Sequence, residues 1–208
     1  MRRFLVAMAL SAGLGVSSLA SASSIFSDNF NGENGGSPTL NYYGFANWTV
    51  PVGSVDLIGN GYFDFLPGNG LYVDLDGSTG QAGTMVSSPI SLSAGSYDFK
   101  FDLAGDQRNA PPEPVTAAVD GGIVSQVYLL PSAQGFTTFN LPFTLSTPQV
   151  VTLSFAETGN SNMGMLLDNV DLSSITSTAG APLPPAFVTG SALMALMGAA
   201  KLRRKLAI

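Results

Sequence analysis

The chain of 208 residues contains no His and no Cys. It therefore cannot form a Ser-His-Asp triad, a Cys nucleophile, a zinc site of the usual His and Cys ligands, or a disulfide framework. Charged residues make up only 11% of the chain, against about one quarter in average soluble proteins. This low value indicates that part of the chain is built for a membrane, and the length fits one domain with targeting segments.

The N-terminal segment has the layout of a secretory signal peptide. Arg2 and Arg3 precede an apolar run over residues 4–16, and small side chains follow at Ala20 and Ala22. A basic start, an apolar centre and a small-x-small end are typical of segments removed by signal peptidase, so we expect export with cleavage after Ala22. The alternative is a buried N-terminal helix.

The C-terminal segment predicts a short membrane span. Residues 186–200 carry no charge and follow Pro182-Leu183-Pro184-Pro185. Fifteen helical residues rise about 22 Å, and flanking residues extend this toward the roughly 30 Å of a hydrocarbon core. We expect a transmembrane helix at about residues 185–202. A basic cluster then stays on the cytoplasmic side, and its members are Lys201, Arg203, Arg204 and Lys205.

Three elements in this order, Pro182-Leu183-Pro184, an apolar helix and the basic cluster, resemble the PEP-CTERM sorting signal of Gram-negative bacteria. Leu183 stands at the central position that is usually Glu in that family. The resemblance implies processing by an exosortase, a membrane-embedded transpeptidase that cuts near the motif. It also implies transient anchoring in the inner membrane and delivery to the outer envelope or extracellular matrix.

The segment between these two ends is strongly acidic. Lys100 and Arg108 are its only basic residues against all 14 acids, which gives a formal net charge of −12. Binding to phosphates depends on Lys and Arg, so this charge excludes a nucleic-acid partner. It suits divalent cations or neutral polymers instead.

Apolar and polar residues alternate with period two through this segment, most clearly over residues 97–103, 151–155, 139–141 and 71–75. Further predicted strands cover residues 48–50, 55–58, 62–65, 115–119, 123–130 and 166–172. About ten short strands with one apolar face each favour two packed antiparallel sheets. We therefore predict an all-β domain, a β-sandwich of jelly-roll type over residues 23–172. Residues 173–181 are small and uncharged, as in a flexible linker.

The last predicted strand carries a carboxylate among aliphatic residues. Period two places Asp168 on the same side as Leu166, Val170 and Leu172. An unpaired carboxylate there is costly, so Asp168 needs a cation, backbone donors or Arg108 as its partner, or a bulge that turns it outward. Simple acceptance of backbone hydrogen bonds is the leading alternative.

Two short motifs resemble the edges that hold a structural calcium in jelly-roll carbohydrate-binding modules: Asp28-Asn29-Phe30 and Leu167-Asp168-Asn169-Val170. The resemblance implies Ca²⁺ at Asp28 and Asp168. Residues 74–80 resemble a calcium loop, but the later ligands and a closing Glu are missing. An Asp-Gly pair between two strands is more typical of a turn.

Residues 41–48 combine flat aromatic rings with amides, which are the components of a sugar-stacking platform. The single Trp48 lies in a predicted strand, and an isolated Trp in a sandwich is more typical of the core. Tyr42 and Tyr43 are therefore the predicted ligand residues.

Three functions follow from these observations. The leading one is a non-enzymatic, exosortase-sorted envelope or matrix protein that binds polysaccharide. The second is a calcium-dependent adhesive or structural protein. The third is a glycoside hydrolase with paired carboxylates. Glu113, in a Pro-rich loop, and Glu157, after a strand, have no sequence context that indicates a raised pKa, so we expect no catalysis.

Overall fold

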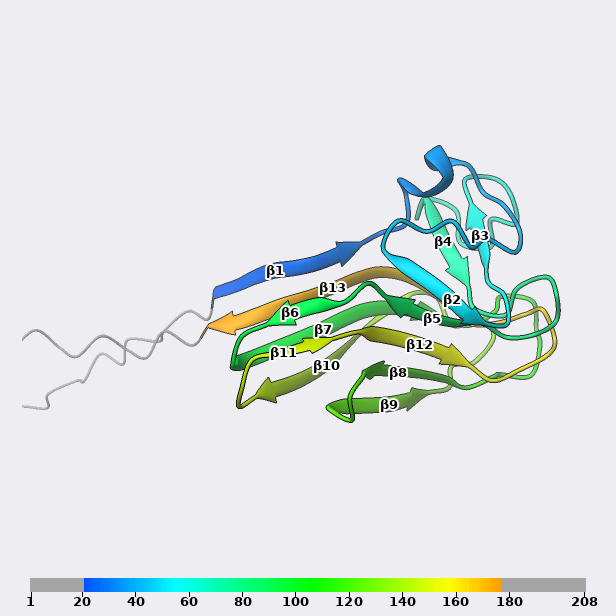
Figure 1. The fold of residues 1–208 in the computed structure, drawn as a ribbon. Helices are drawn as coiled ribbons and strands as arrows, with labels where there is room; N and C mark the ends of the chain where they lie inside the picture. The colour runs from blue at the N-terminus through cyan, green and yellow to red at the C-terminus, as the bar shows by residue number, and fades with distance from the viewer. Residues whose placement is uncertain (1–20, 177–208) are drawn as a thin grey trace, which may run out of the picture. The chain divides into compact units, whose positions relative to one another are not determined.

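Strand β7 (Gly95–Ala104) shows how the alternation builds the fold. Its inward residues Tyr97, Phe99 and Phe101 are buried, whereas the residues between them are partly exposed. The computed structural model describes residues 21–176, which form β-strands, loops and one short 3-10 helix (Figure 1). None of these residues belongs to a helix long and apolar enough to cross a membrane. Ala20, Pro182, Leu183, Pro184 and the basic cluster lie outside the described residues.

The first sheet has β13 (Leu166–Thr176) near its centre, with β1 (Ser21–Asp28) paired to it. Its path runs β10-β7-β13-β4-β3. The remaining strands are β10 (Thr137–Leu145), β4 (Leu71–Asp74) and β3 (Asp56–Gly59).

The second sheet is also antiparallel and runs β2-β5-β12-β8-β9. Its strands are β2 (Trp48–Val52), β5 (Thr84–Ser87), β12 (Leu153–Glu157), β8 (Val115–Val119) and β9 (Val124–Tyr128). A separate pair joins β6 (Ile90–Leu92) to β11 (Gln149–Val151), and the 3-10 helix η1 covers Glu33–Gly36.

Aromatic rings from the two sheets meet in the main core. Phe155 of β12 packs against Phe99 and Phe101 of β7, with ring centroids 5.5 and 5.0 Å apart. All three side chains are fully buried. The predicted all-β sandwich is thus confirmed, because the two sheets bury their apolar faces against each other.

A second, smaller core lies on the outer face of the first sheet. Ile58, Tyr72, Ala104 and Leu166 are buried there under a loop of residues 60–70. The Tyr72 hydroxyl donates to Asp64 (3.2 Å) and accepts from the Leu66 backbone N–H (3.0 Å), which fixes that loop. The prediction of a strand over residues 62–65 is therefore wrong, since these residues form turns and cover the sheet.

Several other boundaries differ from the sequence prediction. The patterns do not predict β1, β5 or β6, which are short or lack a clear alternation. The strand expected over residues 151–155 is divided between the end of β11 and most of β12. Strand β13 continues to Thr176, so the sandwich includes residues 173–176 of the expected linker.

A bulge in β13 changes the orientation expected for Asp168. The register with β7 shifts between Asp168 and Asp171. Residues directly opposite each other in a pair share a face, so Asp168 lies on the same outer side as its partner Asp102. The shift brings Val170 and Leu172 into the main core with Leu167. Asp168 therefore shares a side with Leu166 only, and the expected row of three aliphatic neighbours is wrong.

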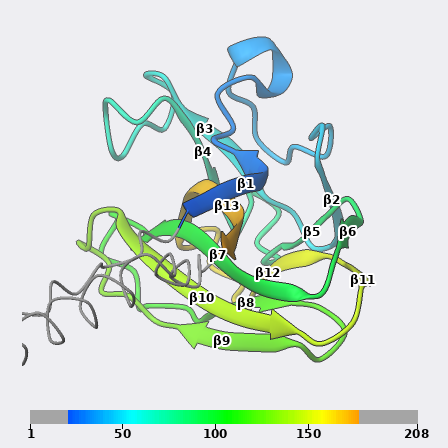
Figure 2. The same ribbon diagram turned by 90° about the vertical axis from the view of Figure 1, so that its left-hand side faces the viewer.

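The two chain ends of this unit lie together. Strand β1 begins and β13 ends at the same end of the sandwich, on the left in Figure 1. Figure 2 looks from that end and shows β1 against β13. The ends of β4, β7 and β12 and the start of β13 lie at the opposite end. That end carries the site described next.

Candidate functional site

Carboxylates gather where β4 ends and β13 begins. Leu166 lies opposite Asp74 in one pairing and Ala104 in the other, so the loops after β4, β7 and β12 converge here. Buried acids in this region are Asp56, Asp74, Asp76, Asp106 and Glu157. Each needs donors or a cation, because an uncompensated buried charge is costly.

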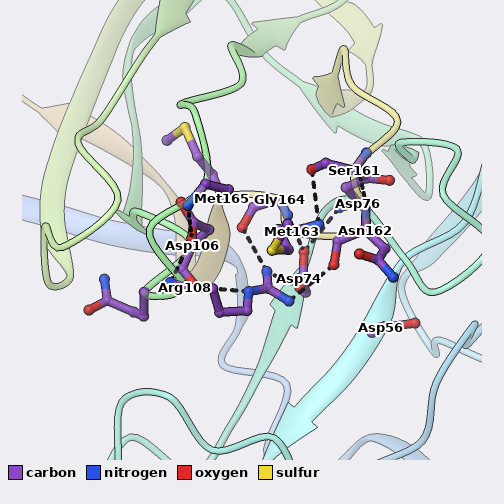
Figure 3. Close-up of polar contacts among 12 residues, drawn as sticks. Asp56, Asp74, Asp76, Asp106, Arg108, Ser161, Asn162, Met163, Gly164 and Met165 are labelled. Carbon is purple, nitrogen blue, oxygen red and sulfur yellow. Dashed lines mark hydrogen bonds and ion pairs between the residues drawn. The ribbon is translucent and has the colours of Figure 1, made fainter.

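Arg108 is the cation at the centre of this cluster (Figure 3). Its Nη2 donates to Asp74 Oδ2 at 2.6 Å, its Nη1 to the Asn162 carbonyl at 3.1 Å and its Nε to the Asp106 carbonyl at 3.0 Å. The guanidinium lies 4.7 Å from the centroid of the Phe65 ring, within cation–π range. The sequence left Arg108 as a partner for Asp168, whereas the structure pairs it with Asp74.

Backbone groups complete the environment of Asp74. Its Oδ1 accepts from the N–H groups of Asp76 (3.1 Å) and Gly164 (3.0 Å). Burial raises the pKa of Asp74 above the ordinary aspartate value, and the charge and hydrogen bond of Arg108 oppose that rise. We hold that Asp74 is ionised, because three donors, one of them a guanidinium, surround it. Residues 75–80 form bends and a turn after β4, in line with the expected turn.

A pocket of about 280 Å³ opens beside the Arg108–Asp74 pair. Its walls mix rings and aliphatic chains with a few polar groups, as is common in small-ligand sites. The lining residues are Leu40, Asp56, Ile58, Phe63, Phe65, Asp74, Ser78, Arg108, Asn162 and Met163. We call this the Arg108 pocket.

Phe63 stands at this pocket with its side chain 51% exposed. Its backbone has φ of 45°, a left-handed conformation that is unusual for a bulky residue. Tyr62, also exposed, packs edge-on against it with centroids 4.8 Å apart. Strained backbone that holds a ring in solvent is a feature of ligand-binding loops, and no pattern in the sequence singled out Phe63.

A larger, more open groove of about 560 Å³ lies near Asp28. Its walls are polar and acidic, and they comprise Ser27, Asp28, Asn29, Gly32, Glu33, Ala46, Asn47, Asn169, Val170 and Asp171. No aromatic residue is among them. It therefore lacks the ring faces that the Arg108 pocket offers.

Asp28 of this groove already has donors on both oxygens. They accept from Phe30 N (2.9 Å), Trp48 Nε1 (3.0 Å) and Asn47 Nδ2 (3.3 Å). Asp168 is 1% exposed and accepts from the Asn169 N–H at 2.7 Å, which is the backbone alternative predicted above. Over residues 21–176 no three acidic side chains are already arranged to hold a metal ion. Ca²⁺ at Asp28 and Asp168 stays a prediction.

The predicted platform of residues 41–48 is divided between core and surface. Trp48 is buried and packs on Phe30 and Phe155, in line with its expected core role. The Tyr42 hydroxyl accepts from Asn34 N and donates to the Gly44 carbonyl. Tyr43 is 54% exposed. Neither tyrosine lines the Arg108 pocket.

Glu113 and Glu157 differ most from their sequence interpretation. Glu157 is the last residue of β12 and is 4% exposed. Burial raises its pKa well above the ordinary glutamate value, and the pKa of Glu113 is also raised, mainly by partial burial. The alternation of Leu153 and Phe155 continues to Glu157, and this signal could have predicted an inward carboxylate.

Comparisons with known proteins give only weak similarity to solved structures. No family model and no curated protein sequence matches the chain. The C-terminal CBM6 of LamC, from Zobellia galactanivorans, is 13% identical over 44% of this chain and 73% of its own, with a TM-score of 0.33. A family 35 carbohydrate-binding module from Clostridium thermocellum is 17% identical over 65% and 97%, with a TM-score of 0.41.

An exo-β-1,3-galactanase from Phanerochaete chrysosporium is 20% identical over 58% of this chain but only 26% of its own length, with a TM-score of 0.39. At such values the similarity does not extend to function.

Loss of the Arg108 guanidinium should destabilise the fold strongly. Arg108→Met leaves the carboxylate of Asp74, 2% exposed, without its cation, so we expect the free energy of unfolding to fall by about 3–5 kcal/mol. Urea unfolding followed by circular dichroism measures this. Lys100→Met is the control: its pair with Asp98 is 3.5 Å long and the lysine side chain is 42% exposed, so a loss of at most about 1 kcal/mol is expected. Equal effects of both substitutions would contradict a central role for Arg108.

Asp168 should make stability depend on pH. Burial, followed by the nearby charges of Asp102 and Asp28, raises its pKa from 3.8 to about 7. The folded state thus holds this proton more tightly than the unfolded state, and its contribution is complete below about pH 4 and lost as pH rises through 7.

In EDTA we therefore expect Asp168→Asn to gain stability relative to the wild type between pH 5 and pH 8, by an amount on the order of 4 kcal/mol at most. Urea unfolding at pH 5 and at pH 8 gives the difference in unfolding free energy between the variant and the wild type. Asp171→Asn is the control in the same strand. A difference that does not change with pH would mean that Asp168 is ionised throughout.

Proposed function

We propose that this protein binds a polysaccharide by holding a neutral sugar unit in the Arg108 pocket. The observation that carries the proposal is the exposed, strained Phe63 beside fixed polar groups. A flat ring can pack against the apolar face of a sugar, while Asp56, Ser78 and Arg108 offer acceptors and donors to its hydroxyls.

Neutral ligands suit this pocket better than charged ones. Arg108 is already paired with Asp74 at 2.6 Å, which leaves no free cation among the residues that line the pocket for an anionic sugar. The domain as a whole repels polyanions, because its formal net charge is −12.

Binding without catalysis is the second part of the proposal. Both carboxylates that line the pocket have structural partners: Asp56 accepts from Asn41 N (2.7 Å), Ser78 N (3.1 Å) and Ser78 Oγ (2.6 Å), and Asp74 is paired with Arg108. A general acid or nucleophile must face the substrate. Carboxylates held in this way are poorly suited to either role.

Export and sorting form the third part, supported by the two terminal sequence segments. On this proposal signal peptidase and an exosortase process the chain, which passes through the inner membrane to the envelope or matrix of a Gram-negative cell. Strand β1 begins and β13 ends at one end of the sandwich (Figure 1), whereas β4 ends at the opposite end with Asp74, a residue of the Arg108 pocket. A tether at Thr176 would thus leave the pocket open to external polysaccharide.

Replacement of Phe63 by Ala should weaken glycan binding. Loss of one ring contact of this size is worth about 1.4 kcal/mol, or about a tenfold rise in Kd. A glycan array identifies a neutral ligand, and calorimetry with that oligosaccharide gives the Kd. Phe63→Trp should retain binding.

Tyr43→Ala is the matched control, since Tyr43 is similarly exposed but lies outside the pocket. Binding lost in this variant and kept in Phe63→Ala would move the site to the cluster predicted from the sequence. A purified domain that binds no neutral glycan would contradict the proposed function itself.

The secreted form should lack both terminal segments. Intact mass spectrometry of protein from the native host is expected to give a chain that begins at Ser23 and ends near Pro182. Recovery of the full 208 residues from the cytosol would contradict export and sorting, and it would leave the pocket assignment untouched.

A further inference from the structure

Three buried carboxylate oxygens near the Arg108 pocket have no hydrogen-bond partner: Asp76 Oδ1, Glu113 Oε2 and Glu157 Oε2. They come from three separate segments, the loop after β4, the loop before β8 and the end of β12. Asp76 is fully buried and Glu157 is 4% exposed. Buried acceptors of this kind are rare in folded proteins, and each calls for a partner such as a water molecule, a proton or an ion.

Backbone donors satisfy only the other oxygens of Asp76 and Glu157. Asp76 Oδ2 accepts from the N–H groups of Ser161 (2.8 Å) and Asn162 (2.9 Å). Glu157 Oε1 accepts from the Met165 N–H at 2.9 Å. Each carboxylate is thus held firmly by one oxygen, and the second oxygen is left available.

The three acids adjoin one another around the loop of residues 158–165. A side chain at Gly164 would collide with both the Glu157 carboxylate and the Asp76 backbone, so these two groups meet at that glycine. Glu113 lies against Gly159 of the same loop and close to the carboxylate of Asp76.

The domain has no spare basic residue to neutralise these acids. Its only two are Lys100, which pairs with Asp98, and Arg108, which pairs with Asp74. Removing carboxylates from water without a counter-charge costs several kcal/mol per ion. Uptake of a proton by a carboxyl group or binding of a cation from solution is the compensation that remains.

We propose that Asp76, Glu113 and Glu157 bind a divalent hard cation, with Ca²⁺ as the favoured ion. Ca²⁺ takes six to eight oxygen ligands in flexible geometry and accepts carboxylates together with backbone carbonyls and water. Over residues 21–176 no three acidic side chains already surround one point. Binding therefore requires these side chains to converge on one point, and Glu113, the only partly buried member, is the one placed to shift.

Asp28, the residue expected from the sequence to bind Ca²⁺, offers a contrast. Its two oxygens already accept from three donors, whereas the oxygens named here accept from none. The proposed ion would join three loops, one of which supplies Asn162 and Met163 to the wall of the Arg108 pocket. It does not depend on what that pocket binds.

Thermal unfolding with CaCl₂ or EDTA, without any glycan, tests the proposal. At a Ca²⁺ concentration of about 100 times Kd, the melting temperature of the wild type should rise by about 5–10 °C. Glu157→Gln should abolish this rise. In EDTA the same variant should be at least as stable as the wild type, because Gln keeps the acceptor for Met165 and removes a buried charge.

Two further variants make every outcome decisive. Glu113→Gln, in a partly exposed loop, should fold and should also lose the Ca²⁺ response, which guards against misfolding of Glu157→Gln. Asp168→Asn should keep the response. A response that is lost in Asp168→Asn, retained in either Gln variant, or absent from the wild type would overturn the assignment. Whether the Arg108 pocket binds a glycan at all is measured separately and is not decided by that result.

Discussion

The pairing of Arg108 with Asp74 is the interaction on which this end of the molecule depends. Arg108 also holds the carbonyl groups of Asp106 and Asn162, so one guanidinium connects the end of β4 with two loops. Gln107 and Asn109 flank it with φ of 62° each, and these left-handed residues turn the segment so that Arg108 reaches the cluster. Without this cation the loops would have to close over uncompensated carboxylates.

The other buried acids mostly accept hydrogen bonds from backbone N–H groups of the loops and are shielded from solvent. Asp106 Oδ1 accepts from Arg108 N (2.6 Å), Ser132 Oγ (2.9 Å) and Ala110 N (3.3 Å), and Asp56 and Asp76 hold loops in the same way. A domain with few regular elements at this end needs such acceptors for its loop N–H groups. Part of the negative charge is therefore internal, and the outer surface is less acidic than the composition indicates.

The period-two pattern was sufficient to predict an all-β sandwich, because alternation along β7, β12 and β13 decides which side chains are buried. It could not locate the bulge after Asp168, since one extra residue reverses the faces without changing the composition of the strand. Nor could the pattern identify Asp74 as the partner of Arg108, because the two residues are 34 positions apart in the chain. The position of Phe63 could not be predicted either, because an aromatic-rich loop and an aromatic-rich strand have similar sequences and residues 62–65 were expected to form a strand. The burial of Glu157 could have been predicted, because it continues the inward-facing alternate positions of β12.

The proposed sugar site and the proposed cation site share one loop at this end of the sandwich. The Arg108 pocket takes its rigid wall from the first sheet, through Ile58 and Asp74, and its other wall from Asn162 and Met163 in the loop between β12 and β13. That loop is anchored to Asp76 through Ser161 and Asn162, and Asp76 is also a proposed ligand of the ion. An ion at Asp76 would reduce the freedom of the loop before a ligand arrives. The loop would then lose less conformational entropy when the sugar binds. The cation would therefore strengthen sugar affinity without contact between the two ligands.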